Sequence, residues 1–234
     1  MQKLIYPLWK DISLNADAFR QQLIEQLGPK IIAQGSLALR ICVADSDVSG
    51  AAPYRISSDN DPIDAIITVW LDTYLNRSNI EASIASHVDR YSGYAVWESE
   101  PLVVPEQYRV AAGQRSPGMN EVVFLRKPDR LSREAWLDIW HNSHTQVAID
   151  TQSTFGYRQN VVVKTLTDNA SWHDAIIEEN FPEAAIHSRM AFYDAGSDEA
   201  LYRSREQAMI DSCTRFIDFD NMDCIPMSEY ILQH

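Results

Sequence analysis

The hydrophobic pattern of the chain gives the same order of predicted elements twice. In residues 1–104, segments that alternate or run apolar predict strands, and segments with a helical period predict helices. Their order is strand, helix, strand, strand, helix, strand. The same order returns in residues 119–234, and residues 105–118 are expected to link the two halves.

This order is that of a split βαβ, or ferredoxin-like, unit, in which two helices cover one face of a four-stranded antiparallel sheet. The other face of each sheet then needs a partner. We therefore expect an α+β chain of tandem ferredoxin-like βαββαβ repeats whose two sheets face each other as a pseudo-two-fold α/β barrel. The alternative is two such domains packed through their helices.

The pattern also predicts where each element lies. Strands are expected at 3–10, 36–44, 65–74, 94–103, 120–128, 155–166, 186–194 and 224–232. Long helices are expected at 15–34, 79–93, 131–150 and 197–218, and a short helix is expected in an insert at 168–182. Asn15 and Ser132 are the expected N-caps of the two helices that they precede.

Charge and cysteine content exclude several classes of function. The formal net charge of −13 argues against nucleic acid and against anionic membrane surfaces, which both need a basic face. Cys42, Cys213 and Cys224 have no CxxC spacing and are expected to be buried free thiols of a cytoplasmic protein. No apolar stretch approaches the length that spans a membrane.

The helix expected at 131–150 carries two histidines. At 100° per residue, Trp136, Trp140 and Val147 form one apolar stripe, and His144 falls inside it. His141 falls on the flank of the stripe. We therefore expect His144 to be buried against the sheet and His141 to lie at a boundary.

Three interpretations of these histidines are open. His144 could be a hydrogen-bonded core residue, with His141 half exposed. A metal site is the weakest interpretation, because no further ligands join the two imidazoles. The third is chemistry, and a comparison of the halves favours it: aligning Asn15 with Ser132 matches Leu27 to His144, so folding alone does not require a histidine there.

The second half resembles the EthD family of dimeric α/β-barrel proteins. The resemblance is carried by an aromatic residue, a tryptophan and a histidine at intervals of four, followed by a Tyr…Asn pair on the next strand: Trp136, Trp140, His144, Tyr157 and Asn160. It covers residues 119–234 by motif and the first half by topology only. The resemblance implies a barrel that acts on small hydrophobic compounds, with relatives that include cyclases, isomerases, cofactor-free monooxygenases and haem enzymes.

The leading hypothesis is an enzyme that uses general acid–base chemistry, without a cofactor or metal, on a small hydrophobic, aromatic or polyketide-like molecule. His144 is the expected acid or base and Tyr157 a second proton donor. The expected binding residues are Trp136, Trp140, His141, Gln159, Asn160 and His187, the last placed on the strand at 186–194. The alternatives are a non-catalytic small-molecule binder of an oxygenase pathway and haem bound through His144 or His187. A homodimer is compatible with either function.

Overall fold

The protein is an eight-stranded antiparallel barrel with helices packed against its outside, as seen in a computed structural model that describes residues 1–58 and 61–234. The barrel strands are β1 (Gln2–Trp9), β2 (Ala38–Val43), β3 (Ala65–Leu71), β5 (Tyr94–Leu102), β7 (Met119–Leu125), β8 (Gly156–Thr165), β9 (Ala175–Phe181) and β10 (Asp223–Gln233). Two short strands, β4 (Arg90–Tyr91) and β6 (Gln114–Arg115), pair with β1 and β10. The expected α+β class is confirmed.

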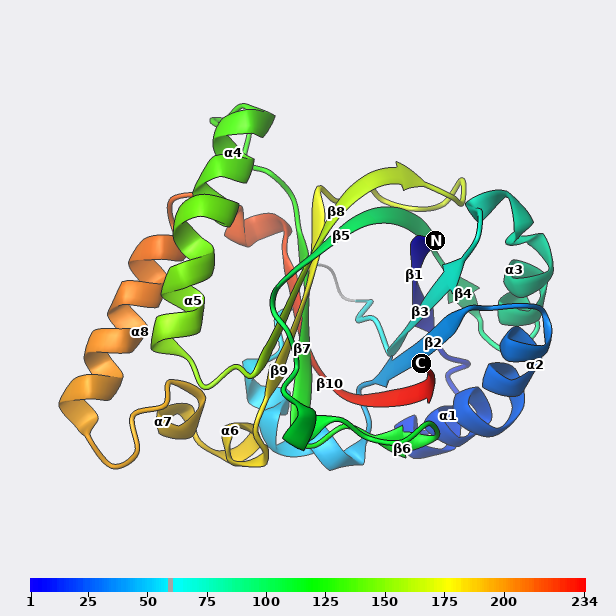
Figure 1. Ribbon diagram of the computed structural model, residues 1–234, viewed down its shortest axis with the longest axis horizontal. Helices are drawn as coiled ribbons and strands as arrows, with labels where there is room; N and C mark the ends of the chain where they lie inside the picture. The colour runs from blue at the N-terminus through cyan, green and yellow to red at the C-terminus, as the bar shows by residue number, and fades with distance from the viewer. Residues whose placement is uncertain (59–60) are drawn as a thin grey trace.

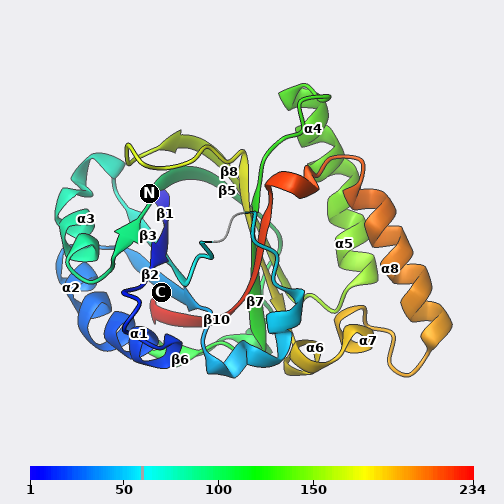
Figure 2. The same ribbon diagram turned by 180° about the vertical axis from the view of Figure 1, so that it is seen from behind.

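Hydrogen bonding closes the sheet into a ring. The strands follow one another in the order β2, β3, β1, β5, β8, β9, β7, β10, and β10 pairs back onto β2. Figure 1 shows this ring of strands, with the helices of the first half outside it on one side and those of the second half on the other. Figure 2 shows the same two helical layers from behind. The halves therefore share one sheet and do not pack through their helices.

Two long helical segments cover the outside of the barrel at equivalent places in the two halves. The first consists of α1 (Ala16–Gln22), a π-helical turn and α2 (Gly28–Ala33). The second consists of α4 (Arg133–Ile139), a π-helical turn and α5 (Thr145–Thr151). The predicted caps are confirmed, because the side chains of Asn15 and Ser132 accept hydrogen bonds from Ala18 and Ala135.

The π turns fall on matching residues. Leu23–Leu27 and Trp140–His144 are equivalent when Asn15 is aligned with Ser132. Each turn closes with a bond from the residue that follows it to the first carbonyl of the turn. A π turn inserts an extra residue and rotates what comes after it. For this reason Ala148, and not Val147 as an ideal helical wheel predicts, is buried in α5, together with Thr145 and Thr151.

The remaining helices are α3 (Ser78–Ala85) in the first half and α6 (Glu183–His187), α7 (Arg189–Phe192) and α8 (Glu199–Cys213) in the second. Short 3-10 helices lie at Ser46–Tyr54, Tyr74–Asn76, Glu106–Tyr108 and Phe219–Asn221. The expected linker, 105–118, contains one of these turns and β6, and its role as a domain boundary stays a prediction. No helix in the described residues is long and apolar enough to cross a membrane.

The predicted position of one strand is wrong. The third strand of the second half is β9 at Ala175–Phe181, where a short helix is expected, while residues 186–194 form parts of α6 and α7 and not a strand. All seven residues of β9 are buried, including Glu178 and Glu179. These two carboxylates make the segment AIIEENF polar in sequence, and for this reason its pattern did not predict a buried strand.

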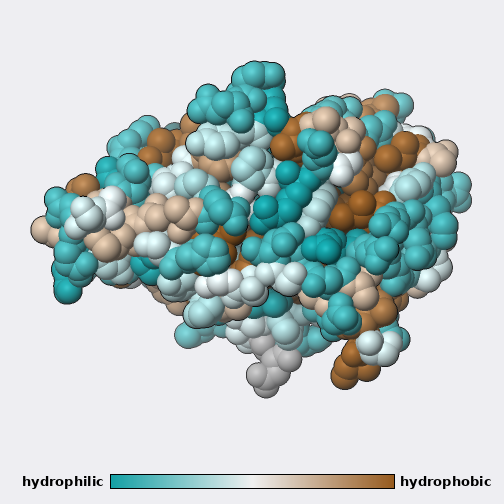
Figure 3. Space-filling view, turned by 90° about the horizontal axis from the view of Figure 1, so that it is seen from below, coloured by the Kyte–Doolittle hydropathy of each residue, from teal (hydrophilic) through white to brown (hydrophobic). Residues whose placement is uncertain are grey.

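The barrel interior is apolar at its middle and charged toward one end. A cluster that includes Ile5, Val122 and Ile176 fills the middle. Nearby, Lys3 Nζ lies 2.6 Å from carboxylate oxygens of both Glu98 and Glu178. Further ion pairs join Arg40 and Arg158 to Glu229, in each case with 3.0 Å between the paired atoms. This network links residues of both halves. The face of the molecule seen in Figure 3 is mostly hydrophilic.

Candidate functional site

The structure places the predicted site residues on different faces of the second half. Tyr157 and Gln159 lie on the outer face of β8, under α4 and α5, where Trp140 Nε1 donates to the Tyr157 hydroxyl at 2.9 Å. Asn160 lies on the inner face, where its Nδ2 donates to Glu178 at 3.0 Å. The expected alternation along this strand is therefore observed, and it keeps Asn160 away from His144.

His144 is buried, as predicted, at a contact between helices. Its Nδ1 lies 2.9 Å from Ser212 Oγ on α8, and its ring lies 4.6 Å from that of Phe216. Burial, together with the nearby Arg215 guanidinium, lowers the pKa of His144 to about 4, so the imidazole is neutral at pH 7. His144 lines none of the cavities described here, and its role in chemistry stays a prediction.

The other predicted binding residues lie apart from His144. Trp136 and Trp140 are fully buried, with ring centroids 5.2 Å apart and ring planes tilted by 45°, so they form core and not an open wall. His141 lines a groove of about 600 Å³ with Leu137 and Trp97, and its Nε2 has no partner among the described residues. His187 is exposed at the end of α6 and not on a strand, which corrects its expected position.

A site that the sequence analysis missed lies across three neighbouring strands. Glu179 on β9 is opposite Tyr157 on β8 and opposite Glu121 on β7. Residues directly opposite on antiparallel strands have Cβ atoms about 5 Å apart. Tyr157, Glu179 and Glu121 therefore form a row on the outer face of the barrel, beneath the helices of the second half. We call this row the carboxylate row.

The two carboxylates of this row disfavour each other's ionisation. Burial and the neighbouring Glu121 raise the pKa of Glu179 to about 8, so Glu179 is protonated at pH 7. Burial also raises the pKa of Glu121, but the Cys224 thiol and the Arg189 guanidinium oppose that shift. The pair therefore holds a proton on Glu179 near neutral pH.

A cavity of about 490 Å³ opens beside the carboxylate row, between the sheet and α5, α7 and α8. Glu121 lines it, together with residues that include Tyr54, Arg189, Phe192 and Tyr193. The Arg189 guanidinium lies 4.9–5.0 Å from the centroids of these three aromatic rings. The cavity thus combines aromatic walls, the Arg189 cation and the Glu121 carboxylate, with Glu179 beside Glu121 on the neighbouring strand.

Several buried polar atoms near this cavity have no partner among the described residues. They are Glu179 Oε1, Gln152 Oε1 and Ser153 Oγ. Buried polar atoms are nearly always hydrogen-bonded, so such a group indicates ordered water or a ligand. Cys213 and Cys224 also line the cavity, but burial raises the pKa of both thiols, that of Cys213 to about 12. They are free thiols, as predicted, and are not activated nucleophiles.

The positions of His144 and His187 give little support to the haem alternative. A haem ligand must present one ring nitrogen to an open space. The Nδ1 atom of His144 is held by Ser212, and neither His144 nor His187 lines a cavity described here. Neither histidine is placed to serve as the axial ligand of a haem iron, and we assign no step to haem.

The fold is that of known barrel proteins. A solved anthrone oxidase-like protein is similar over 100% of this chain and 93% of its own, with a TM-score of 0.58 and 7% identity. A protein of Fusobacterium nucleatum, provisionally named a monooxygenase, is similar over 99% of this chain and 92% of its own, with a TM-score of 0.50 and 9% identity. A chlorite dismutase of Candidatus Nitrospira defluvii matches with a TM-score of 0.48 at 12% identity, too weakly to support an argument.

These comparisons define the class of fold, an α/β barrel, and at such low identities they show the fold alone. No protein-family model matches the sequence, and no curated protein matches it. The resemblance to the EthD family therefore stays a prediction.

Proposed function

We propose that the protein is a small-molecule enzyme and that its active site is the cavity beside the carboxylate row. The observation that carries this proposal is the cross-strand pair of Glu121 and Glu179 next to an aromatic-walled cavity, in which Glu121 and burial raise the pKa of Glu179 to about 8. Titratable groups whose pKa values are pushed apart in one cleft are typical of acid–base sites.

The reaction type follows from this pair. Protonated Glu179 can donate a proton to a substrate carbonyl oxygen, and ionised Glu121 can remove a proton from an acidic carbon whose anion is conjugated with that carbonyl. One proton enters the substrate and one leaves it, so the step is an enolisation or isomerisation that needs no oxidant. Tyr157, which lies opposite Glu179 on the neighbouring strand, would stabilise the Glu179 side chain. A group positioned in this way contributes on the order of 10²–10⁴-fold to rate.

The substrate class follows from the cavity wall. Tyr54, Phe192 and Tyr193 surround Arg189, which suits a planar aromatic molecule that carries an oxygen with partial negative charge. Anthrone, named in the description of one structural neighbour, has this chemistry: an aromatic ketone with an acidic CH₂ group. The EthD resemblance of Trp136, Trp140 and Tyr157 independently favours small hydrophobic substrates.

The test is hydrogen–deuterium exchange at carbons of aromatic ketones, beginning with anthrone, followed by NMR in D₂O. The protein should accelerate this exchange, and Glu179→Gln should lower the enzymatic rate on the order of 10²-fold or more. Glu199→Gln removes an exposed carboxylate of α8 and is the matched control. Equal exchange rates for the two variants would exclude the proposed proton donor. Under the same conditions, an unchanged rate for His144→Leu would remove His144 from the chemistry.

A non-catalytic binder remains the second candidate, because one observation favours it. The predicted catalytic His144 is neutral and hydrogen-bonded between two helices. A binder would hold aromatic ligands in the same cavity with no acceleration of exchange, and its affinity would fall for Arg189→Gln but not for Glu179→Gln.

We further propose that the two halves are ferredoxin-like units of common origin. Within each half the strands follow the order second, third, first, fourth, and the π turns fall on equivalent residues. A homodimer of the whole chain stays a prediction.

A further inference from the structure

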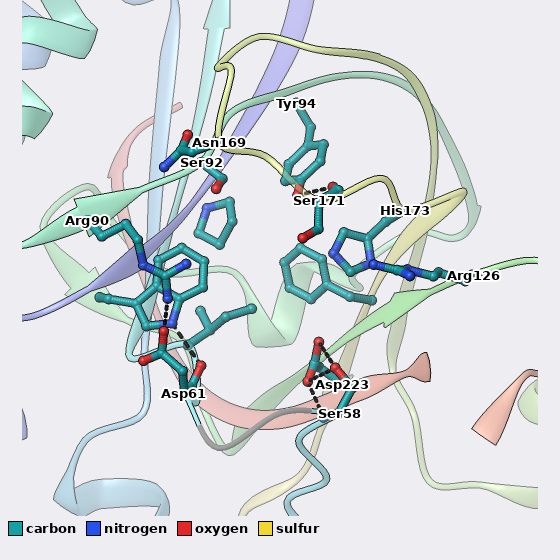
Figure 4. A pocket seen from close by; sticks show the side chains of 14 residues that line it. Ser58, Asp61, Arg90, Ser92, Tyr94, Arg126, Asn169, Ser171, His173 and Asp223 are labelled. Atoms are coloured by element: carbon teal, nitrogen blue, oxygen red, sulfur yellow. Dashed lines mark hydrogen bonds and ion pairs between the residues drawn. The ribbon is translucent and has the colours of Figure 1, made fainter. Parts of the chain in front are cut away.

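One mouth of the barrel contains a polar cavity that is separate from the carboxylate row. It has a volume of about 80 Å³ and lies at the ends of β1, β5, β7 and β10. Figure 4 shows the side chains around it, with His173 and Arg126 on one side and Arg90 and Asp61 on the other. This volume holds several water molecules. It suits a ligand of a few atoms and not a large cofactor.

The imidazole of His173 has no hydrogen bond to any residue that the structure describes. Its side chain is buried, with 9% exposure, just before β9. The rings of Tyr94 and Phe124 contact it edge-on, with centroids at 5.7 and 5.2 Å. The Nδ1 atom is buried and has no partner among residues 1–58 and 61–234. A buried polar group in this state indicates that a ligand or water completes its bonding.

Arg126 lines the same cavity, and its guanidinium has no counter-ion among the described residues. Figure 4 shows its guanidinium next to the His173 ring. No ion pair or hydrogen bond joins it to the described part of the chain. The acidic groups of the cavity are engaged elsewhere. Asp61 pairs with Arg90, and Asp223 accepts hydrogen bonds from the Ser58 backbone N–H at 2.8 Å and from its hydroxyl at 3.1 Å.

The wall between these two groups supplies further donors and an apolar lining. The hydroxyls of Ser92 and Ser171 face the cavity in Figure 4, and Trp9, Ile63 and Phe124 line it. An unpaired guanidinium, an imidazole N–H and hydroxyl donors within one small cavity are the groups that bind an oxyanion.

We infer that the barrel mouth is a binding site for a small oxyanion, with Arg126 as its charge partner and His173 as a hydrogen-bond donor. The apolar lining favours the carboxylate of a small organic acid over inorganic phosphate. The inference does not depend on the function proposed for the carboxylate row, because the two cavities share none of their lining residues.

The test uses the full-length chain labelled with ¹⁵N and titrated with acetate, phosphate or chloride at constant ionic strength. Saturable shifts of the His173 ring and Arg126 side-chain signals with acetate or phosphate support the site. The anion that binds with the higher affinity identifies the anion class. Arg126→Gln should weaken this binding at least about tenfold. Arg203→Gln removes an exposed arginine of α8 and should leave the binding unchanged.

His173→Gln provides a second variant, because glutamine keeps an N–H donor and should retain part of the affinity, whereas His173→Phe should lose it. Shifts that do not saturate, or equal affinity in Arg126→Gln and the unmodified protein, would overturn the inference. A site that binds chloride as well as it binds both oxyanions would also overturn it, because it would show charge attraction without recognition.

Discussion

Glu179 on β9 lies directly opposite Glu121 on β7, on the face of the barrel that the helices of the second half cover. Like charges directly opposite each other in a sheet destabilise it. The pairing of two carboxylates therefore lowers the stability of the fold at this place, and the protonation of Glu179 makes that loss smaller. Local costs of this kind are typical of functional sites.

The raised pKa of Glu179 predicts an unusual dependence of stability on pH. The pKa of Glu179 is raised in the folded protein, to about 8 from its usual value of 4.5. The native state therefore binds a proton that the unfolded state releases between these values, and the free energy of unfolding falls as pH rises through this window. We expect a loss of roughly 3–5 kcal/mol between pH 5 and 9, measured by urea unfolding. Glu179→Gln should abolish most of it, while Glu199→Gln should retain it, and parallel curves for all three proteins would show that the shift is absent.

His144→Leu should fold normally. The equivalent residue of the other half, Leu27, occupies the same position of a π turn, and Ser212 keeps a hydrogen bond from Arg215. We expect a change of less than about 1.5 kcal/mol in the free energy of unfolding at pH 7.

The same variant should resist acid better than the unmodified protein. The lowered pKa of His144, about 4, means that its stabilising contribution is complete above about pH 6.5 and is lost as pH falls through 4. Thermal unfolding at pH 4 and 7 measures both effects. A loss of more than about 3 kcal/mol at pH 7 would show that position 144 requires a histidine for folding.

The hydrogen bond between Trp140 and Tyr157 should give a measurable coupling energy. Both side chains are fully buried, and the indole N–H donates to the hydroxyl at 2.9 Å. Trp140→Phe leaves the hydroxyl without this donor, and Tyr157→Phe leaves the indole N–H without its acceptor. A double-mutant cycle on urea unfolding should yield about 1 kcal/mol of coupling, whereas additive losses would mean that the bond does not form.

Glu178 should be needed to balance the charges inside the barrel. Burial opposes its ionisation, but Arg40, Lys3 and Arg158 outweigh burial and hold its pKa well below the usual range. Glu178→Gln would leave buried cations uncompensated, and we expect a loss of about 3–5 kcal/mol in the free energy of unfolding. Glu98→Gln is the matched control, because Glu98 also pairs with Lys3 but is partly exposed. Equal, small losses in both variants would mean that water reaches the network.

The sequence was enough to predict the barrel class, the two N-caps and the burial of His144, because apolar period and capping chemistry are local signals. It did not reveal β9, since the burial of Glu178 depends on Lys3 and Arg40 from the other half of the chain. The carboxylate row was missed for the same reason. Glu121 and Glu179 are far apart in sequence, and only the register of β7 and β9 brings them together. The alternation of Glu121 with apolar neighbours on its strand was the one available signal.

The protonation of Glu179 tests the account most directly. A ¹³C NMR titration of the glutamate side-chain carboxyls, on the unmodified protein and on Glu179→Gln, measures it without a substrate. We predict one carboxyl that titrates near pH 8 and disappears in the variant. If every glutamate carboxyl titrates below about pH 5, as isolated glutamates do, then Glu179 is ionised at neutral pH and cannot serve as the proton donor.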